Sequence, residues 1–129
     1  MARKIKWLTE KYIKSQAISR KKALLCSRLH WWQLKTAGPK ELKRAYSAGF
    51  VSIHTDHCAL CKRYYLINCD TGCPLQCLDL WGKTSDAFYN WRRNPTRTNW
   101  QAWKKASMAL YEKIDRVIRR LYPKEESLE

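Results

Sequence analysis

The sequence contains no apolar segment of the length that a membrane requires. A transmembrane helix needs roughly 20 consecutive apolar residues, and no stretch of the 129 residues approaches that length. The first ten residues, MARKIKWLTE, also lack the apolar core of a secretory signal. We therefore expect a cytoplasmic protein without a membrane partner, in a reducing compartment where clustered cysteines are more often metal ligands than disulfides.

Acidic residues are scarce, and the resulting charge is unevenly distributed. The chain has 26 Lys and Arg against 11 Asp and Glu, a formal net charge of +15. Residues 1–50 hold 13 basic residues against two acids, residues 51–91 hold three against four, and residues 92–129 hold ten against five. The positive charge therefore comes from two flanks of a nearly neutral middle segment.

The sequence also lacks the usual signatures of catalysis. It has no H-E-x-x-H, no paired-carboxylate motif and no glycine-rich phosphate loop. The segment HTDH supplies His54, Asp56 and His57, which could in principle serve a catalytic zinc, but four thiolates would leave no coordination position for water. We expect no enzymatic activity and no small-molecule substrate.

The middle segment instead carries five of the six cysteines, with the spacing C-x2-C-x7-C-x3-C-x3-C. A C-x2-C pair places two thiolates on one ion, and a second pair can complete a tetrahedron. The ligands predicted first are Cys58, Cys61, Cys69 and Cys73. Cys77 and His57 are possible substitutes, and His54 is also near enough in sequence to take part. The pattern favours a structural Zn²⁺, with an iron–sulfur cluster as the less favoured alternative and disulfides or free thiols after that.

The flanks have helical periodicity, which predicts a mainly α protein. We expect a single small domain of about four or five helices with a short inserted hairpin in the metal-binding knuckle, of which KRYYLIN would be one strand. Its expected parts are a basic helical region (3–49), a cysteine-rich module (50–83), C-terminal helices (84–122) and a tail (123–129).

Capping residues and stops give the expected helix boundaries. Ser19 begins a helix that ends at Gly38, and Pro39 begins a second one that ends at Gly49. An earlier segment with Leu8 and Tyr12 is either a separate helix or the start of a longer one.

Two further helices are expected near the C-terminus. TSDAFYNWRRNP begins with capping residues and predicts a short helix before Pro95, and the last helix starts at Thr98 or Asn99 and stops at Pro123.

The same periodicity predicts which side chains pack. The expected apolar face comprises Leu25, Leu29 and Trp32 on the helix after Ser19, Leu42, Ala45 and Tyr46 on the next, Phe88 and Trp91, and Trp100, Trp103, Leu110, Tyr111, Ile114, Val117, Ile118 and Leu121 on the last. Cys26 is expected to be a buried small hydrophobe, and His30 to have no special role. Trp31 and Trp32 are adjacent and cannot face the same way.

The cysteine spacing and the residues after it resemble a group of small bacteriophage-encoded proteins. Those proteins have a C-x-L-C pair, a C-x-x-C-P step, another cysteine, a Tyr and Trp, and a closing amphipathic helix. The matching residues, within about 50–115, are Cys58, Leu60, Cys61, Cys69, Cys73, Pro74, Cys77, Tyr89 and Trp91. The chain departs from the pattern in its C-x3-C second pair and in the early position of Cys77. The resemblance implies a phage accessory protein acting in the bacterial host cytoplasm, and it implies no activity.

The charge predicts the partner. A surface rich in Lys and Arg attracts polyanions, and each neutralised phosphate adds affinity through counterion release. The residues expected to contact DNA or RNA are Lys21, Lys22, Arg28, Lys43, Arg44, Arg92, Arg93 and Arg97. Aromatic residues between the basic clusters could stack on unpaired bases. The alternative is an effector that binds and inhibits or redirects an acidic host protein, since the same charge would steer that association.

Overall fold

The computed structural model describes residues 6–51 and 78–124, and this part of the chain is helical. The helices are α1 (Glu10–Ser15), α2 (Arg20–Thr36), α3 (Pro39–Ser47), α5 (Leu78–Arg93) and α6 (Arg97–Leu121). No strand occurs among these residues. The predicted fold class, a small mainly helical domain, is confirmed. The predicted hairpin and the five clustered cysteines lie outside the described residues, whereas the last part of the predicted module, 78–83, belongs to α5.

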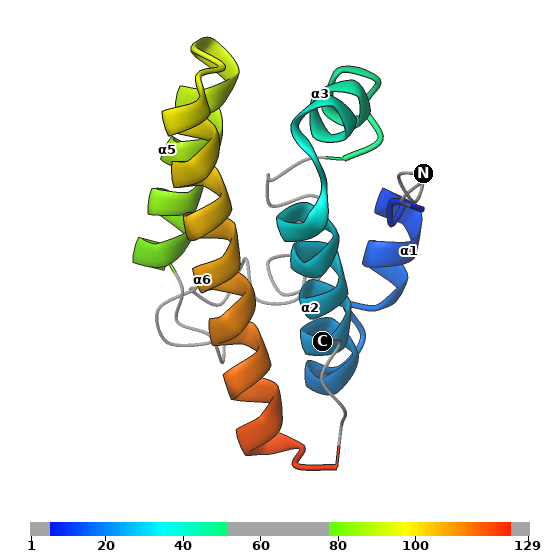
Figure 1. Ribbon diagram of the computed structural model, residues 1–129. Helices are drawn as coiled ribbons and strands as arrows, with labels where there is room; N and C mark the ends of the chain where they lie inside the picture. The colour runs from blue at the N-terminus through cyan, green and yellow to red at the C-terminus, as the bar shows by residue number, and fades with distance from the viewer. Residues whose placement is uncertain (1–5, 52–77, 125–129) are drawn as a thin grey trace.

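The long helix α6 packs against both α5 and α2, with α5 beside its first part and α2 beside its later part (Figure 1). It runs antiparallel to each, so that the start of α2 lies beside the end of α6 and the end of α5 joins the start of α6 (Figure 1). The short helix α3 lies at the end of the molecule where α2 ends, and α1 lies on the side of α2 away from α6 (Figure 1).

Trp103 of α6 lies at the centre of the core. Its side chain is fully buried, and its ring centroid lies 5.1 Å from that of Phe88 in α5 and 6.2 Å from that of Trp31 in α2. Phe88 in turn meets Tyr46 of α3 at 5.0 Å in an edge-to-face arrangement. Such ring contacts add roughly 0.5–1.5 kcal/mol beyond the burial of area, and here they join four helices.

The predictions for α6 were largely correct. Its expected apolar positions are buried or half-buried, and the helix ends just before Pro123. The cap is Thr96, two residues earlier than predicted, whose Oγ1 accepts a hydrogen bond from the amide of Asn99 at 3.1 Å. The Asn99 side chain instead donates to the carbonyl oxygen of Asn94 at 2.9 Å and so closes the α5–α6 turn.

Helix α5 begins earlier than the sequence predicted. The capping residues expected near Thr84 lie inside the helix, and the boundary expected between residues 83 and 84 falls within it. Thr84 is fully buried, and its hydroxyl makes a long hydrogen bond, 3.5 Å, to the carbonyl oxygen of Ala106 in α6. A residue type that favours helix starts serves here as a small packing residue. Phe88 and Trp91 are buried as predicted.

The buried face of α2 differs from the predicted one. Leu25, Leu29 and Trp32 are only half-buried. Five of the buried residues of α2 are polar, Ser27, Arg28, His30, Gln33 and Lys35. A search for apolar periodicity cannot find such a face, because polar residues occupy it. Cys26 is buried as expected, and of the adjacent pair Trp31 is buried and Trp32 half-buried.

Gln33 explains how the N-terminal segment is held on α2. Its Oε1 accepts a hydrogen bond from the amide of Leu8 at 3.2 Å, and its Nε2 donates to the carbonyl oxygen of Lys6 at 2.6 Å. Helix α1 then follows as a separate short helix with Ile13 buried, while the expected packing residue Tyr12 is exposed. None of the helices in the described part of the chain has both the length and the apolar character of a membrane span.

Candidate nucleic-acid interface

Five predicted phosphate-binding residues lie at one end of the molecule, where α3 and the α5–α6 turn are found (Figure 1). We call them the turn cluster: Lys43, Arg44, Arg92, Arg93 and Arg97. All five side chains are exposed. The Arg92 guanidinium lies 4.5 Å from the centre of the Tyr46 ring, and Arg93 donates to the side chain of Asn90 at 2.8 Å. A guanidinium stacked on a ring keeps its N–H edge available for an anion.

No member of the turn cluster forms an ion pair within residues 6–51 and 78–124. Arg97 occupies the first turn of α6, which contains no acid. A positive charge at a helix N-terminus opposes the macrodipole at a cost of about 0.3–1 kcal/mol. An anion bound at this end would relieve both the mutual repulsion and the dipole term.

Two more of the predicted phosphate-binding residues, Lys21 and Lys22, are exposed, and they lie at the start of α2, far from the turn cluster. Lys21 and Lys22 follow Arg20 in the first turn of α2, capped by the Ser19 hydroxyl, and we call these three basic residues the start cluster. Tyr122, just after α6, accepts a hydrogen bond from Nε of Arg20 at 3.2 Å, and the Lys21 amine lies 5.5 Å from its ring centre. An open hollow of about 360 Å³ is lined by Lys21 and the residues that follow α6.

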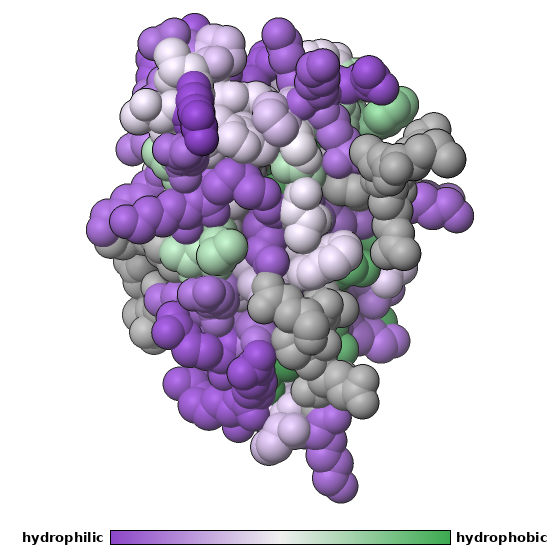
Figure 2. Space-filling view, in the orientation of Figure 1, coloured by the Kyte–Doolittle hydropathy of each residue, from purple (hydrophilic) through white to green (hydrophobic). Residues whose placement is uncertain are grey.

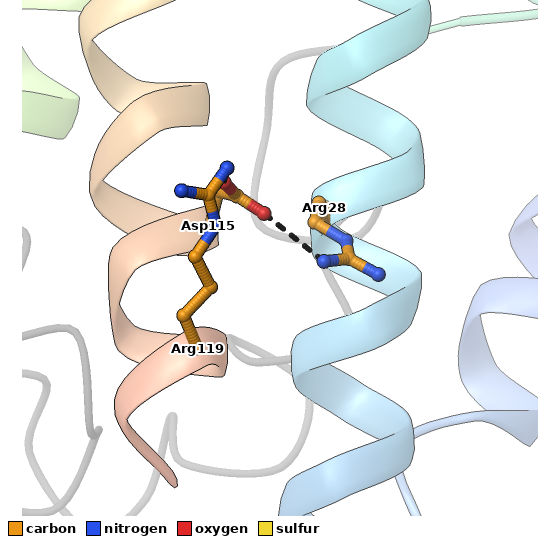
Figure 3. A network of polar contacts seen from close by, with 3 residues as sticks. All are labelled: Arg28, Asp115 and Arg119. Carbon is orange, nitrogen blue, oxygen red and sulfur yellow. Dashed lines mark hydrogen bonds and ion pairs between the residues drawn. The ribbon is translucent and has the colours of Figure 1, made fainter. Parts of the chain in front are cut away.

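Arg28 does not belong with the exposed residues, which corrects the predicted set. It is only 5% exposed, and its Nη1 lies 3.0 Å from Oδ1 of the buried Asp115 in α6 (Figure 3). Arg119 approaches the second oxygen of the same carboxylate at 2.6 Å from the solvent side (Figure 3). Sequence reasoning counted Arg28 as surface charge because most arginines are exposed, whereas here it is an interior link between α2 and α6.

The outer face of α6 carries exposed basic residues that the predicted site omitted. They are Lys105, Arg116, Arg119 and Arg120. Hydrophilic side chains cover most of the visible surface over α6, with small hydrophobic areas between them (Figure 2). The signal was present in the sequence, since these residues lie opposite the apolar face in the helical repeat.

Tryptophans are not available as stacking platforms on this surface. All seven lie in the described part of the chain, and each is buried or half-buried. The exposed aromatic side chains among the described residues are Tyr12 and Phe50, and neither belongs to the turn cluster or to the basic residues at the start of α2. The expectation that aromatics between the basic clusters stack on bases therefore finds no exposed tryptophan to carry it.

Two lysines lie close together where the end of α2 meets α6. The amine of Lys104 donates to the carbonyl oxygen of Lys35, and the Lys35 amine lies 4.9 Å from the centre of the Tyr111 ring. Partial burial lowers the pKa of Lys104, and the positive charge of Lys35 lowers it further. These amines take part in packing between helices rather than in either exposed cluster.

All the predicted zinc ligands lie between residues 52 and 77, outside the described residues. Among the residues that are described, no group of His, Cys, Asp and Glu is arranged to hold a metal ion. No known protein family, curated protein or solved structure matches this chain.

Proposed function

We propose that this protein binds nucleic acid through the exposed basic residues of its helices. The observation that supports the proposal most is the turn cluster, in which three helices bring five exposed cations together without an acidic partner among the described residues. Phosphates neutralise such charge and release counterions as they bind. The start cluster and the outer face of α6 extend the same positive surface.

Binding should therefore depend steeply on salt. Each phosphate contact contributes a slope of about −0.9 in log K against log salt for duplex DNA. The test is the fluorescence anisotropy of a labelled duplex, titrated with the protein between about 50 and 200 mM salt. A steep loss of affinity supports the proposal, and the absence of binding at the lowest salt contradicts it.

A matched pair of variants separates the cluster from general charge. Lys43→Gln with Arg93→Gln removes two charges from the turn cluster, and Lys11→Gln with Lys14→Gln removes two exposed charges from α1. We expect the first variant to lose about two units of salt slope and the second to retain the wild-type slope. Equal losses in both would mean that the turn cluster has no particular part in binding.

The alternative partner, an acidic host protein, is tested by a pull-down with and without nuclease. Release of everything by nuclease supports nucleic-acid binding, whereas one stoichiometric protein that survives nuclease contradicts it. The resemblance to bacteriophage proteins would place either activity in an infected bacterial cell, as an accessory function.

For the cysteine-rich segment we propose a structural zinc ion. The support is the sequence spacing of Cys58, Cys61, Cys69 and Cys73. Small structural zinc sites bind with apparent free energies of roughly 10–16 kcal/mol, so the ion should survive purification. Elemental analysis should find one zinc per chain, and iron or no metal would contradict the proposal.

A further inference from the structure

The exposed basic residues of α6 form a broad ridge along one side of the helix. The ridge consists of Arg97, Lys105, Arg116, Arg119 and Arg120, all exposed. At 3.6 residues per turn, these five positions fall within an arc of about 140°. The opposite side of α6 is buried against α2 and α5. The ridge therefore faces solvent along the whole helix.

The length of the ridge is close to the length of one turn of duplex DNA. From Arg97 to Arg120 the helix rises about 35 Å at 1.5 Å per residue. One turn of B-form DNA is about 34–36 Å long, or 10–10.5 base pairs. A rigid helix of this length, with Arg97 at one end and Arg120 at the other, can reach phosphates one turn apart without bending the DNA.

An acid separates the cations of the ridge into two groups. Glu112, the one acid on the exposed side of α6, lies between Lys105 and Arg116. Arg97 and Lys105 therefore lie in the first half of the helix and Arg116, Arg119 and Arg120 in the second half, and the acid between them would repel a phosphate. The turn cluster lies at the end that contains Arg97 and the start cluster at the end that contains Arg120 (Figure 1).

The ridge has no aromatic side chain on which an unpaired base could stack. Proteins that hold single strands stack bases on exposed aromatic side chains, and the exposed ones among the described residues, Tyr12 and Phe50, do not lie on α6. A duplex keeps its bases stacked internally and needs only cations along its backbone.

We propose that the outer ridge of α6 lies along one turn of duplex DNA and contacts its phosphates at both ends of the helix. This inference rests on the proposed nucleic-acid binding and gives it a ligand class and a length. Affinity should rise at least tenfold when a duplex grows from half a turn to a full turn. Beyond one turn it should rise only in proportion to the number of places where the protein can bind.

The experiment measures anisotropy with labelled hairpin duplexes of about 5, 10 and 20 base pairs, chosen around one turn, at one low salt concentration. A smooth rise without a step overturns the ridge, while the proposed function stands as long as the protein binds any of them. No binding to any length overturns the proposed function itself. A single strand, or an RNA duplex of one turn, that binds as tightly as the DNA duplex also overturns the assignment to duplex DNA.

A matched pair of variants locates the step. Arg97→Gln with Arg120→Gln removes the outermost cation at each end of the ridge, and Lys11→Gln with Lys14→Gln serves as the control of equal charge on α1. The ridge variant should lose the step between half a turn and one turn, and the control should keep it. A step that persists in the ridge variant overturns the proposal.

Discussion

The two faces of α6 carry the same charged residue types in opposite surroundings. On the inner face Asp115 is buried and holds both the buried Arg28 and the exposed Arg119. On the outer face Glu112 is exposed among exposed cations. The buried acid is committed to the contact with α2, so it offsets none of the charge on the rest of the ridge. The comparison shows how one helix can hold the core together through Asp115 and still present exposed positive charge to solvent.

Of the substitutions considered, removal of the buried acid Asp115 should lower the free energy of unfolding most. Asp115→Ala leaves Arg28 buried without its partner, and breaking a buried pair in this way costs about 3–5 kcal/mol. Glu112→Ala on the outer face should change the free energy of unfolding by no more than about 0.5 kcal/mol. Urea denaturation followed by circular dichroism measures both.

A second variant keeps this prediction testable if Asp115→Ala does not fold. Arg28→Met with Asp115→Leu replaces both charges by apolar side chains, and it should recover most of the lost stability, because the cost comes from the unpaired charge. Equal stabilities for Asp115→Ala and Glu112→Ala would show that the Arg28 contact does not stabilise the fold.

The next largest difference in stability is expected between substitutions of a buried and a half-buried leucine of α2. Leu34 is fully buried, so Leu34→Ala should cost about 2–5 kcal/mol through lost burial and the cavity left behind. Leu25→Ala, on the half-buried side that apolar periodicity favoured, should cost about 1 kcal/mol. Thermal denaturation of the two variants decides between the observed and the predicted face, and the reverse order would restore the predicted one.

Much of the fold could be predicted from the sequence, and the exceptions have one physical cause. The apolar face of α6 could be predicted because apolar side chains recur along it at intervals of three, four and seven residues. The buried polar positions of α2 could not, because Arg28 is paired with Asp115 and Gln33 forms hydrogen bonds with the backbone of Lys6 and Leu8. These partners lie far away in sequence, and without them a polar residue looks exposed.

The candidate site was predictable to a similar degree. The turn cluster was found because its basic residues are contiguous in KELKR and WRRNPTR. The ridge on α6 was missed because its cations are spread over 24 residues and only the helical repeat aligns them. Arg28 was wrongly included because charge alone does not reveal burial.

The smallest expected effect is a pH dependence of stability caused by Lys104, which lies at the edge between the inner and outer faces of α6. Its pKa is lowered by partial burial and by the charge of Lys35, so folding penalises its charged form. Below the lowered pKa that penalty is fully present. As pH rises from there toward the ordinary lysine value, the unfolded chain binds more protons than the folded one, and stability increases. The penalty is gone above both pKa values.

The measurement compares the free energy of unfolding of the wild type with that of Lys104→Met from about pH 8 to pH 10, below the ordinary lysine pKa. The free energy of unfolding of the wild type should increase relative to that of Lys104→Met as the pH rises. Tyr89, whose pKa is raised by burial and by its hydrogen bond with Tyr46, gives the opposite trend, but it does so in both proteins and cancels in the difference. A difference that does not vary with pH would contradict the lowered pKa of Lys104.

The most direct test of the central claim is the salt slope for duplex DNA of at least one turn, measured on the wild type and on Lys105→Gln with Arg116→Gln. If the outer face of α6 contacts phosphates, the slope of log K against log salt should become less negative by about two in the variant. Equal slopes for the two proteins would contradict the claim that the outer face of α6 is a phosphate-binding surface.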